Sequence, residues 1–138
     1  FPYMDVLKIE PTRHKAGVLL DPDNHYIEFT GFSLPEDAMA FFLPIINWLY
    51  EYSNHCKEYI AQGVHLKVNF KLSYYNSASY RAFLEMFHIF AKMQREGLKV
   101  TINWYYEAMD SSMQEGGKDL SDIAKIDINL IEIPEKHP

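Results

Sequence analysis

The sequence predicts an α/β fold in which a mixed β-sheet carries its helices mainly on one face. Three observations favour this class. Strand-like and helix-like segments follow one another in the order βββαβαβαβ, the central strands alternate apolar and polar residues, and no repeat or linker interrupts the 138 residues. Alternation leaves one strand face polar, whereas a doubly wound nucleotide-binding sheet buries both faces of its central strands. A dinucleotide-binding fold is therefore disfavoured.

Three short β-rich segments open the chain, in "DVLKIEPT", "GVLLD" and "HYIEFTG". The turn formers "PDN" separate the second segment from the third, so we expect one strand followed by a β-hairpin. Met4 has the character of an initiator. The single domain is therefore expected to span residues 4–138, with residues 1–3 extraneous to it.

A long helix is predicted next, from Ser33 to Gly63. Ser33 and Glu36 have the spacing of a capping box, and Gly63 is a typical C-terminal stop. Pro44 is expected to kink the helix near its second turn, because proline removes a backbone hydrogen bond there. The residues that should face the core recur at spacings of three and four: Ala38, Phe42, Ile45, Leu49, Tyr52, Cys56 and Tyr59.

Two alternating strands flank a second long helix. The segment "VHLKVNFKLSY" alternates over its whole length, as a strand with one buried face does. A helix from about Ser77 to Glu96 follows and is expected to end at Gly97. In the next strand, "LKVTINWYY", the alternation points Trp104 and Tyr106 into the core and leaves Tyr105 facing outward.

The C-terminal part is predicted to hold a polar loop over residues 107–119, a short helix around Leu120 to Lys125 and a last strand in "DINLIEI". The loop is long for a compact domain, and long ordered loops often carry function. Gly116 and Gly117 would let it flex. A functional loop and a plain solvated connector remain equally open.

Composition and charge argue against several classes of function. The net charge is −6 and no run of Lys or Arg occurs, which disfavours a nucleic-acid groove. The longest apolar run, "AMAFFLPII", is too short to span a bilayer, so we expect a soluble, cytoplasmic protein. The lone cysteine, Cys56, lies on the apolar stripe of the long helix, which favours a core position over a reactive thiol.

Motifs for catalysis, phosphate binding and metal binding are absent from the sequence: it contains no G-x-G-x-x-G, no P-loop, no G-x-S-x-G and no H-E-x-x-H. The six histidines never fall at metal-ligand spacing from one another. Glu36 and Asp37 form a carboxylate pair, but their place in the first turn of a helix favours a role at the helix dipole. We therefore expect no cofactor, no metal and no catalytic residue.

The stretch "SYYNSAS" joins the central strand to the second long helix. Asn76 or Ser77 can cap this helix, which stabilises a helix by ~1 kcal/mol. The same position also suits a chemical switch. The free N–H groups and positive dipole end of a helix favour an added phosphate of charge about −1.5 to −2. The local pattern allows a cap, a switch or both.

The chain resembles the SiaC family of bacterial regulatory phosphoproteins, which are related in shape to the STAS domains of anti-sigma-factor antagonists. The resemblance runs nearly end to end. It is carried by "IEPT", "GFSLPEDAMAFFLPIINWLYEY", "FKLSYYNSASYRAFLEM", "GLKVTINWYYE" and "INLIEI". It implies a STAS-like single domain with the mixed sheet described above.

The resemblance also implies a non-enzymatic regulatory role. In that family a dedicated Ser/Thr kinase phosphorylates the hydroxyl residue after the asparagine, and a PP2C-type phosphatase removes the phosphate. The unphosphorylated form binds and activates a diguanylate cyclase. By this motif Ser77 is the acceptor, Ser79 its main rival and Ser73 a weaker one. The surface read by partners is expected to include Tyr75, Asn76, Ser77, Ser79, Tyr80 and Tyr105.

Three alternatives remain. A partner-exchange module of the anti-sigma-factor-antagonist kind would share the fold and the switch without binding a cyclase. A small hydrolase with Ser77 as nucleophile is disfavoured, because neither a nucleophile elbow nor a neighbouring general base accompanies the serine. A nucleic-acid-binding module is the least favoured, because of the negative charge.

Overall fold

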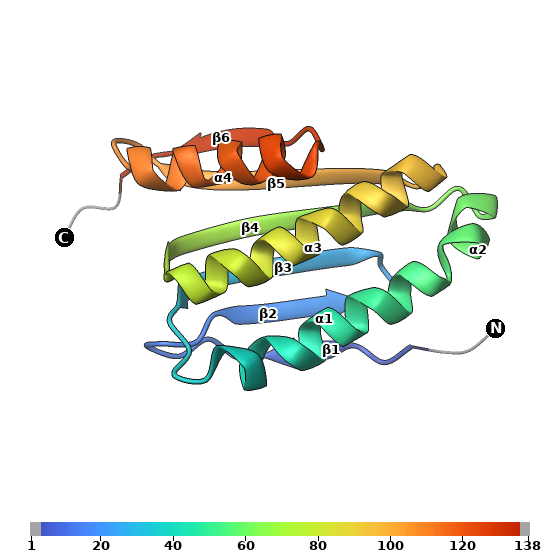
Figure 1. Ribbon diagram of the computed structural model, residues 1–138, viewed down its shortest axis with the longest axis horizontal. Helices are drawn as coiled ribbons and strands as arrows, with labels where there is room; N and C mark the ends of the chain where they lie inside the picture. Colours follow the sequence, from blue (N-terminus) through green and yellow to red (C-terminus); the bar gives the residue numbers. More distant parts are fainter. Residues whose placement is uncertain (1–3, 136–138) are drawn as a thin grey trace.

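The computed structural model describes residues 4–135 and consists of a six-stranded sheet with helices on one face (Figure 1). The strands lie in the sheet in chain order: β1 (Leu7–Ile9), β2 (Gly17–Asp21), β3 (Tyr26–Ser33), β4 (His65–Tyr75), β5 (Lys99–Glu107) and β6 (Asn129–Ile133). Strands β1 to β3 pair antiparallel, and β3 to β6 pair parallel. This arrangement confirms the predicted α/β class. The expectation about residues 1–3 lies outside the described residues.

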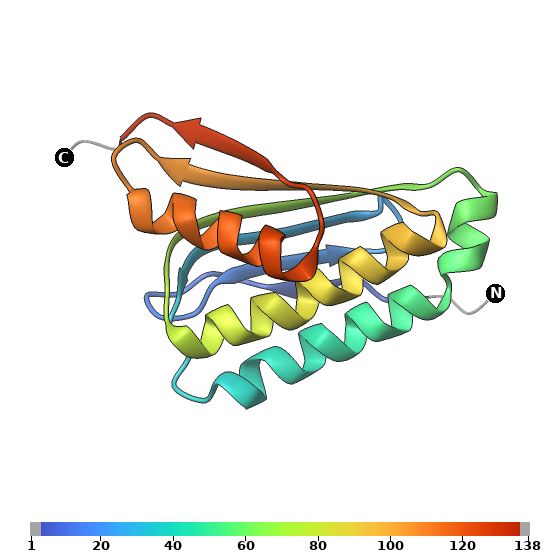
Figure 2. The same cartoon turned by 45° about the horizontal axis from the view of Figure 1, so that its top comes forward.

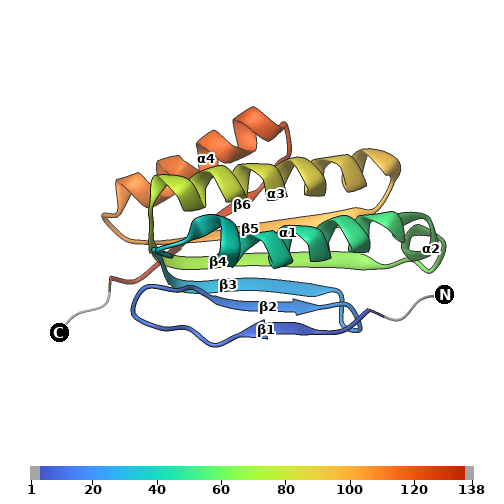
Figure 3. The same ribbon diagram turned by 60° about the horizontal axis from the view of Figure 1, so that its bottom comes forward.

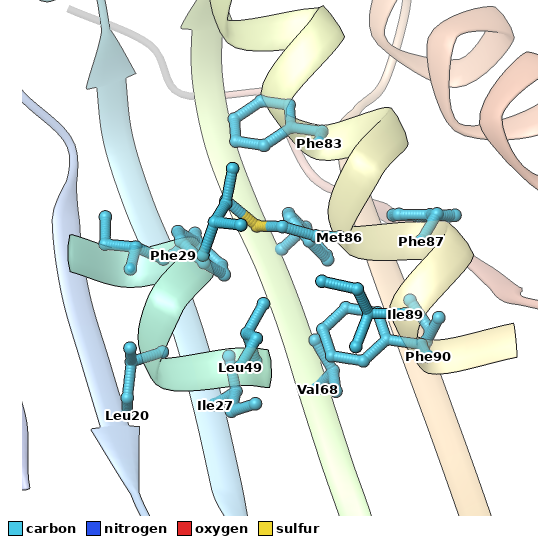
Figure 4. Close-up of a cluster of buried hydrophobic side chains, with 14 of the residues drawn as sticks. Leu20, Ile27, Phe29, Leu49, Val68, Phe83, Met86, Phe87, Ile89 and Phe90 are labelled. Atoms are coloured by element: carbon cyan, nitrogen blue, oxygen red, sulfur yellow. The ribbon is translucent and has the colours of Figure 1, made fainter. Parts of the chain in front are cut away.

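The helices occupy one layer above the sheet, which Figure 3 shows from the side. They are α1 (Ala38–Asn54), α2 (Cys56–Ala61), α3 (Ser77–Glu96) and α4 (Ser111–Ala124). In Figure 4, Ile27 and Phe29 of the sheet meet Leu49 of α1 and Met86 of α3 in the interior. No helix within residues 4–135 is long and apolar enough to cross a membrane.

Helix α1 begins later than the sequence predicts, so the prediction of a capping box at Ser33 is wrong. The helix cap is Asp37, whose carboxylate accepts a hydrogen bond from the Ala40 N–H at 3.0 Å. Ser33 instead ends β3, in register with Tyr75 of β4. It is fully buried, and its hydroxyl bonds within the interior, so it cannot cap a helix.

The predicted single helix is also divided. Helix α1 continues through Pro44 and ends at Asn54, and α2 starts after His55. The break re-aims the chain so that Cys56 and Tyr59 are both buried. The core position expected for the cysteine is thus confirmed. The kink expected at Pro44 stays a prediction.

Helix α4 replaces most of the flexible loop predicted over residues 107–119, and the short helix predicted at Leu120 to Lys125 is only its last part. Gly116 and Gly117 lie buried within it. A Cβ atom on Gly117 would lie 2.6 Å from Cδ1 of Trp104, and one on Gly116 would overlap the Tyr75 hydroxyl. The two glycines therefore allow α4 to approach the sheet closely, and flexibility is not their role.

The face of the sheet without helices is polar, as the alternation predicts. A hydrogen-bonded row of amides crosses three strands there. Asn129 of β6 donates to Asn103 of β5, and Asn103 donates to Asn69 of β4, each at 2.9 Å. Tyr105 also lies on this face, with the Lys71 ammonium 5.3 Å from its ring centroid. The outward orientation of Tyr105 is confirmed.

Candidate functional site

The candidate site is the joint between β4 and α3. Asn76 has an extended backbone, and its side-chain oxygen accepts a hydrogen bond from the Ser79 N–H at 2.9 Å. Its own N–H donates to the Ser33 carbonyl at 3.1 Å. Asn76 is therefore the cap, and Ser77 is the first residue of the helix. At the other end Gly97 stops α3 with a left-handed backbone, φ 117°, as predicted.

The two candidate acceptor serines have opposite environments. Ser79 is fully buried, and its hydroxyl donates to the Ser33 carbonyl at 3.0 Å and lies 2.8 Å from the Ser33 hydroxyl. Ser77 is exposed. A kinase must reach the hydroxyl that it modifies, and a phosphate on Ser79 would have to displace a buried, fully bonded pair. Access thus favours Ser77.

Ser73 is exposed as well, but it belongs to a different local structure. It lies within β4, before the chain reaches the helix. A phosphate at Ser73 would gain nothing from the dipole of α3, because that effect is confined to the first turn of a helix. Ser77 is the one of the three serines that is both exposed and within this turn.

Two backbone donors remain open at the joint. Of the first four N–H groups of a helix, none has a partner inside the helix. The donors of Asn76 and Ser79 are occupied by Ser33 and by the cap. Within the described residues the N–H groups of Ser77 and Ala78 have no acceptor. These two groups, together with the positive end of the helix dipole, can receive an oxyanion.

Aromatic side chains from β4, α3 and β5 pack together next to the joint. The rings of Tyr75 and Tyr80 stack with centroids 6.3 Å apart, and Tyr75 meets Trp104 edge-on at 6.1 Å. Burial raises the pKa of the Tyr75 phenol to about 12, and the nearby Tyr80, Asp119 and Asp110 raise it further. Burial and Asp119 raise the pKa of Tyr80 too. Both phenols are therefore neutral at physiological pH.

The structure brings together five of the six residues expected at the partner surface: Tyr75, Asn76, Ser77, Ser79 and Tyr80. Tyr105 is not among them. It contacts Lys71 on the open face of the sheet, whereas Ser77 starts a helix on the covered face. Ser79 belongs to the joint only as a buried support.

A groove beside Ser77 was not predicted from the sequence. It lies between α1 and α3, has a volume of about 410 Å³ and includes Ala78 and Arg81 in its wall. The signal for it was present, because Met39, Leu43 and Tyr50 are spaced by four and seven residues on α1. That spacing forms a second apolar stripe beside the one that faces the core.

Within residues 4–135 the Ser77 hydroxyl makes no hydrogen bond to a histidine or carboxylate that could act as a general base. Nor do three or more His, Cys, Asp or Glu side chains gather anywhere in this part of the chain to hold a metal ion. The arrangement offers an accessible hydroxyl, an anion-receptive helix end and an adjacent groove.

Comparison with known proteins identifies a matching family and a sequence relative. The family model described as SiaC family regulatory phosphoprotein matches residues 9–133. An uncharacterized protein of Pseudomonas aeruginosa, strain UCBPP-PA14, is 22% identical over 113 residues, covering 81% of this chain and 84% of that protein.

Two solved structures share the fold. Apo-SiaC from Pseudomonas aeruginosa superposes with a TM-score of 0.79 at 18% identity, covering 93% of this chain and 99% of that chain. SiaC of the same organism, in complex with the diguanylate cyclase SiaD that it activates, gives a TM-score of 0.80 at 17% identity. That match covers 92% of this chain and 99% of the other.

Proposed function

Because the chain belongs to the SiaC family of regulatory phosphoproteins, we propose that it is a non-enzymatic switch in which phosphorylation of Ser77 controls partner binding. One observation carries the choice of residue. Ser77 is exposed at the start of α3, whereas Ser79 is buried against Ser33. A reversible modification needs a hydroxyl that both a kinase and a phosphatase can reach.

The proposed partner is a diguanylate cyclase. The solved SiaC of Pseudomonas aeruginosa activates such an enzyme, SiaD, and shares the fold of this chain. We assign the cyclase-binding state to the unphosphorylated form. A dedicated Ser/Thr kinase would add the phosphate and a PP2C-type phosphatase would remove it, so the chain would couple these two enzymes to cyclic-di-GMP synthesis.

The switch works by local charge. The phosphate brings about −1.5 to −2 units of charge to a position with two open N–H donors and a positive dipole end, so it is held at the helix start. A partner surface that needs this end of α3 then meets a bulky anion. Couplings of about 1–3 kcal/mol change affinity roughly 5- to 150-fold, so no large rearrangement is needed.

The first experiment is phosphopeptide mass spectrometry on the chain purified from its native host, resolving Ser73, Ser77 and Ser79. Phosphate is expected at Ser77. Phosphate at Ser73 alone, or at none of the three under any growth condition, would contradict the proposed switch. Phosphate at Ser79 would show that the joint opens far enough to expose a buried hydroxyl, and would move the site.

The second experiment compares variants in binding to a diguanylate cyclase from the same host. Ser77→Ala should bind and activate the cyclase without regulation, and Ser77→Asp should bind about 5- to 150-fold more weakly. Ser73→Asp is the matched control, because Ser73 is exposed but lies in a strand. Equal affinity of both Ser77 variants would count against the switch. Binding of an anti-sigma factor in place of any cyclase would favour the partner-exchange alternative.

A further inference from the structure

The sheet ends at β6, and one side of this strand is unpaired. β6 pairs with β5 over its whole length, from Asn129 to Ile133, without a shift of register. In Figure 2 it is the outermost strand, and within residues 4–135 no strand pairs with its other side. The opposite edge strand, β1, has three residues to the five of β6. Because an edge strand presents unpaired N–H and C=O groups, β6 is the longer template for an added strand.

One hydrogen bond shows which backbone groups of β6 are unpaired. The Ala108 N–H donates to the Ile133 carbonyl at 2.8 Å, so Ile133 turns its backbone groups toward β5. Successive residues of a paired strand turn these groups to opposite sides. Leu130 and Glu132 therefore point their N–H and C=O groups away from the sheet. Within the described residues nothing bonds to these groups, which repeat every ~6.6 Å along the strand.

Apolar side chains on both sides of this edge are incompletely covered. Leu130 pairs with Trp104 and points toward the helices, whereas Ile131 pairs with Tyr105 and points to the open face. Both are only partly buried, and so is Ile133. A strand inside the sheet differs, since Val68 of β4 is fully buried. One more strand beside β6 would cover this apolar surface.

The charge around β6 indicates what kind of strand fits. Residues 122–135 contain one cation, Lys125, and four acids: Asp122, Asp127, Glu132 and Glu135. No ion pair between described residues includes any of the five. Lys136 follows in the sequence, outside the described residues. The surplus of acids favours a segment that carries positive charge.

The same acids disfavour a second copy of the chain as the occupant. Two β6 strands side by side would bring their carboxylates together, and like charges on facing strands destabilise a sheet. A charged residue on an edge strand is a common protection against such self-pairing. Glu132 protects β6 against its own kind and leaves it open to a basic strand.

We propose that β6 binds an extended, basic segment of a partner protein, which adds a seventh strand to the six-stranded sheet. Its backbone would exchange hydrogen bonds with Leu130 and Glu132, and its apolar side chains would cover Ile131 and Ile133. A helix could not bind in this way, because its backbone groups are bonded internally. This interaction is separate from the proposed switch, since it uses none of the residues at the joint.

The test uses three synthetic peptides of about nine residues, long enough to pair along the whole of β6. One alternates Val and Lys, and one alternates Val and Glu. The third is the Lys peptide with methylated backbone nitrogens, which keeps the charge but cannot donate hydrogen bonds. Binding to the full chain is followed by ¹⁵N–¹H NMR titration. The Lys peptide should shift the amides of β6 and bind about fivefold more tightly than the Glu peptide. Methylation should weaken the Lys peptide more than tenfold.

Two variants at one position separate the backbone from the charge. Glu132→Pro removes an outward donor and no hydrogen bond of the sheet, and proline is tolerated where an edge N–H faces solvent. It should weaken the Lys peptide more than tenfold. Glu132→Gln, the matched control, keeps the N–H and should weaken it less than fivefold. Dispersed spectra would show that both variants fold, and the methylated peptide makes the same test on the natural chain.

Several results would overturn the inference. The Lys peptide could fail to bind at about 1 mM, or could shift amides away from β6. Equal binding of the methylated peptide, or an affinity unchanged by Glu132→Pro in a folded variant, would mean that charge alone attracts the peptide. A dimer of the free chain that Glu132→Pro dissolves would assign the edge to a second copy and overturn the inference too.

Discussion

The hydroxyl groups of Ser33 and Ser79 lie 2.8 Å apart in the interior, although 46 residues separate them in the chain. The Ser79 hydroxyl also donates to the Ser33 carbonyl at 3.0 Å, and the same carbonyl accepts from the Asn76 N–H. This small network fixes the start of α3 to the end of β3. The position of Ser77 therefore depends on a contact that Ser77 does not itself make.

Ser79→Ala is predicted to destabilise the chain by about 1–3 kcal/mol, because the buried Ser33 hydroxyl loses its partner. The Ser33→Ala and Ser79→Ala double variant should lose less than the sum of the two single variants, since no unpaired hydroxyl remains. Urea unfolding measures both values. Strict additivity would show that the two hydroxyls do not form an energetic pair.

Asn76→Ala is predicted to lower the free energy of unfolding by ~1 kcal/mol, through loss of the cap on the Ser79 N–H. Asn76→Asp should retain stability, because a carboxylate caps equally well and suits the helix dipole. Chemical denaturation of the two variants gives the comparison. An alanine variant as stable as the aspartate variant would contradict the assigned cap.

Gly117→Ala is predicted to destabilise the chain by roughly 2 kcal/mol or more, because the new methyl group meets the Trp104 indole. Helix propensity alone predicts the opposite sign, a gain of up to ~1 kcal/mol. Thermal unfolding followed by tryptophan fluorescence separates the two. Ser112→Ala, at an exposed position of the same helix, is the control that should show no such loss.

Acidification is predicted to lower the free energy of unfolding, through protonation of His25. Burial lowers the pKa of this imidazole, against the opposing charges of Asp21 and Asp23, and its Nδ1 lies 2.7 Å from the Tyr52 hydroxyl. Because the folded pKa lies below the unfolded one, the unfolded chain takes up the proton first as pH falls. The contribution of neutral His25 to stability is fully present above about pH 6.5. It is lost as the pH falls from there through the folded pKa.

The check is urea unfolding between about pH 7.5 and pH 5, above the range in which most carboxylates titrate. His25→Asn is the comparison variant, since His25 has a left-handed backbone, φ 52°, that asparagine tolerates. The variant should lose part of the pH dependence seen in the natural chain over this range. Identical pH profiles would remove His25 as its cause.

The strands were predictable because their signal is local. In β4 the residues Leu66, Val68, Phe70 and Leu72 alternate with polar ones, and this period decides which face is buried. The limits of α3 were predictable for the same reason, since its cap and its terminal Gly97 lie beside it in sequence. Local chemistry and the final fold agree in these elements.

The errors occur where distant residues decide the structure. Gly116 and Gly117 indicate a loop by propensity, but contact with Tyr75 and Trp104 makes glycine necessary inside α4. Ser33 has the spacing of a capping box, but it ends β3, and its hydrogen-bond partner, Ser79, lies 46 residues further along the chain in α3. No local pattern contains these contacts.

The distinction between Ser77 and Ser79 was within reach of the sequence. Ser79 precedes the buried Phe83 by four residues and therefore lies on the core side of α3. Ser77, Arg81 and Glu85 share the opposite, exposed side. The helical periodicity thus separates a buried Ser79 from an exposed Ser77, whereas the motif around Asn76 leaves both serines as candidates.

The order of the strands has a consequence for how the chain is made. Because each strand pairs with its predecessor, the sheet can grow from one edge as the ribosome releases the chain. The chain between two paired strands is shorter than it would be for a more distant partner, which lowers the entropy cost of closing that loop. Ser33 and Ser79 both precede α4 and β6 in the chain, so the joint that holds Ser77 can close while α4 and β6 are still being synthesised.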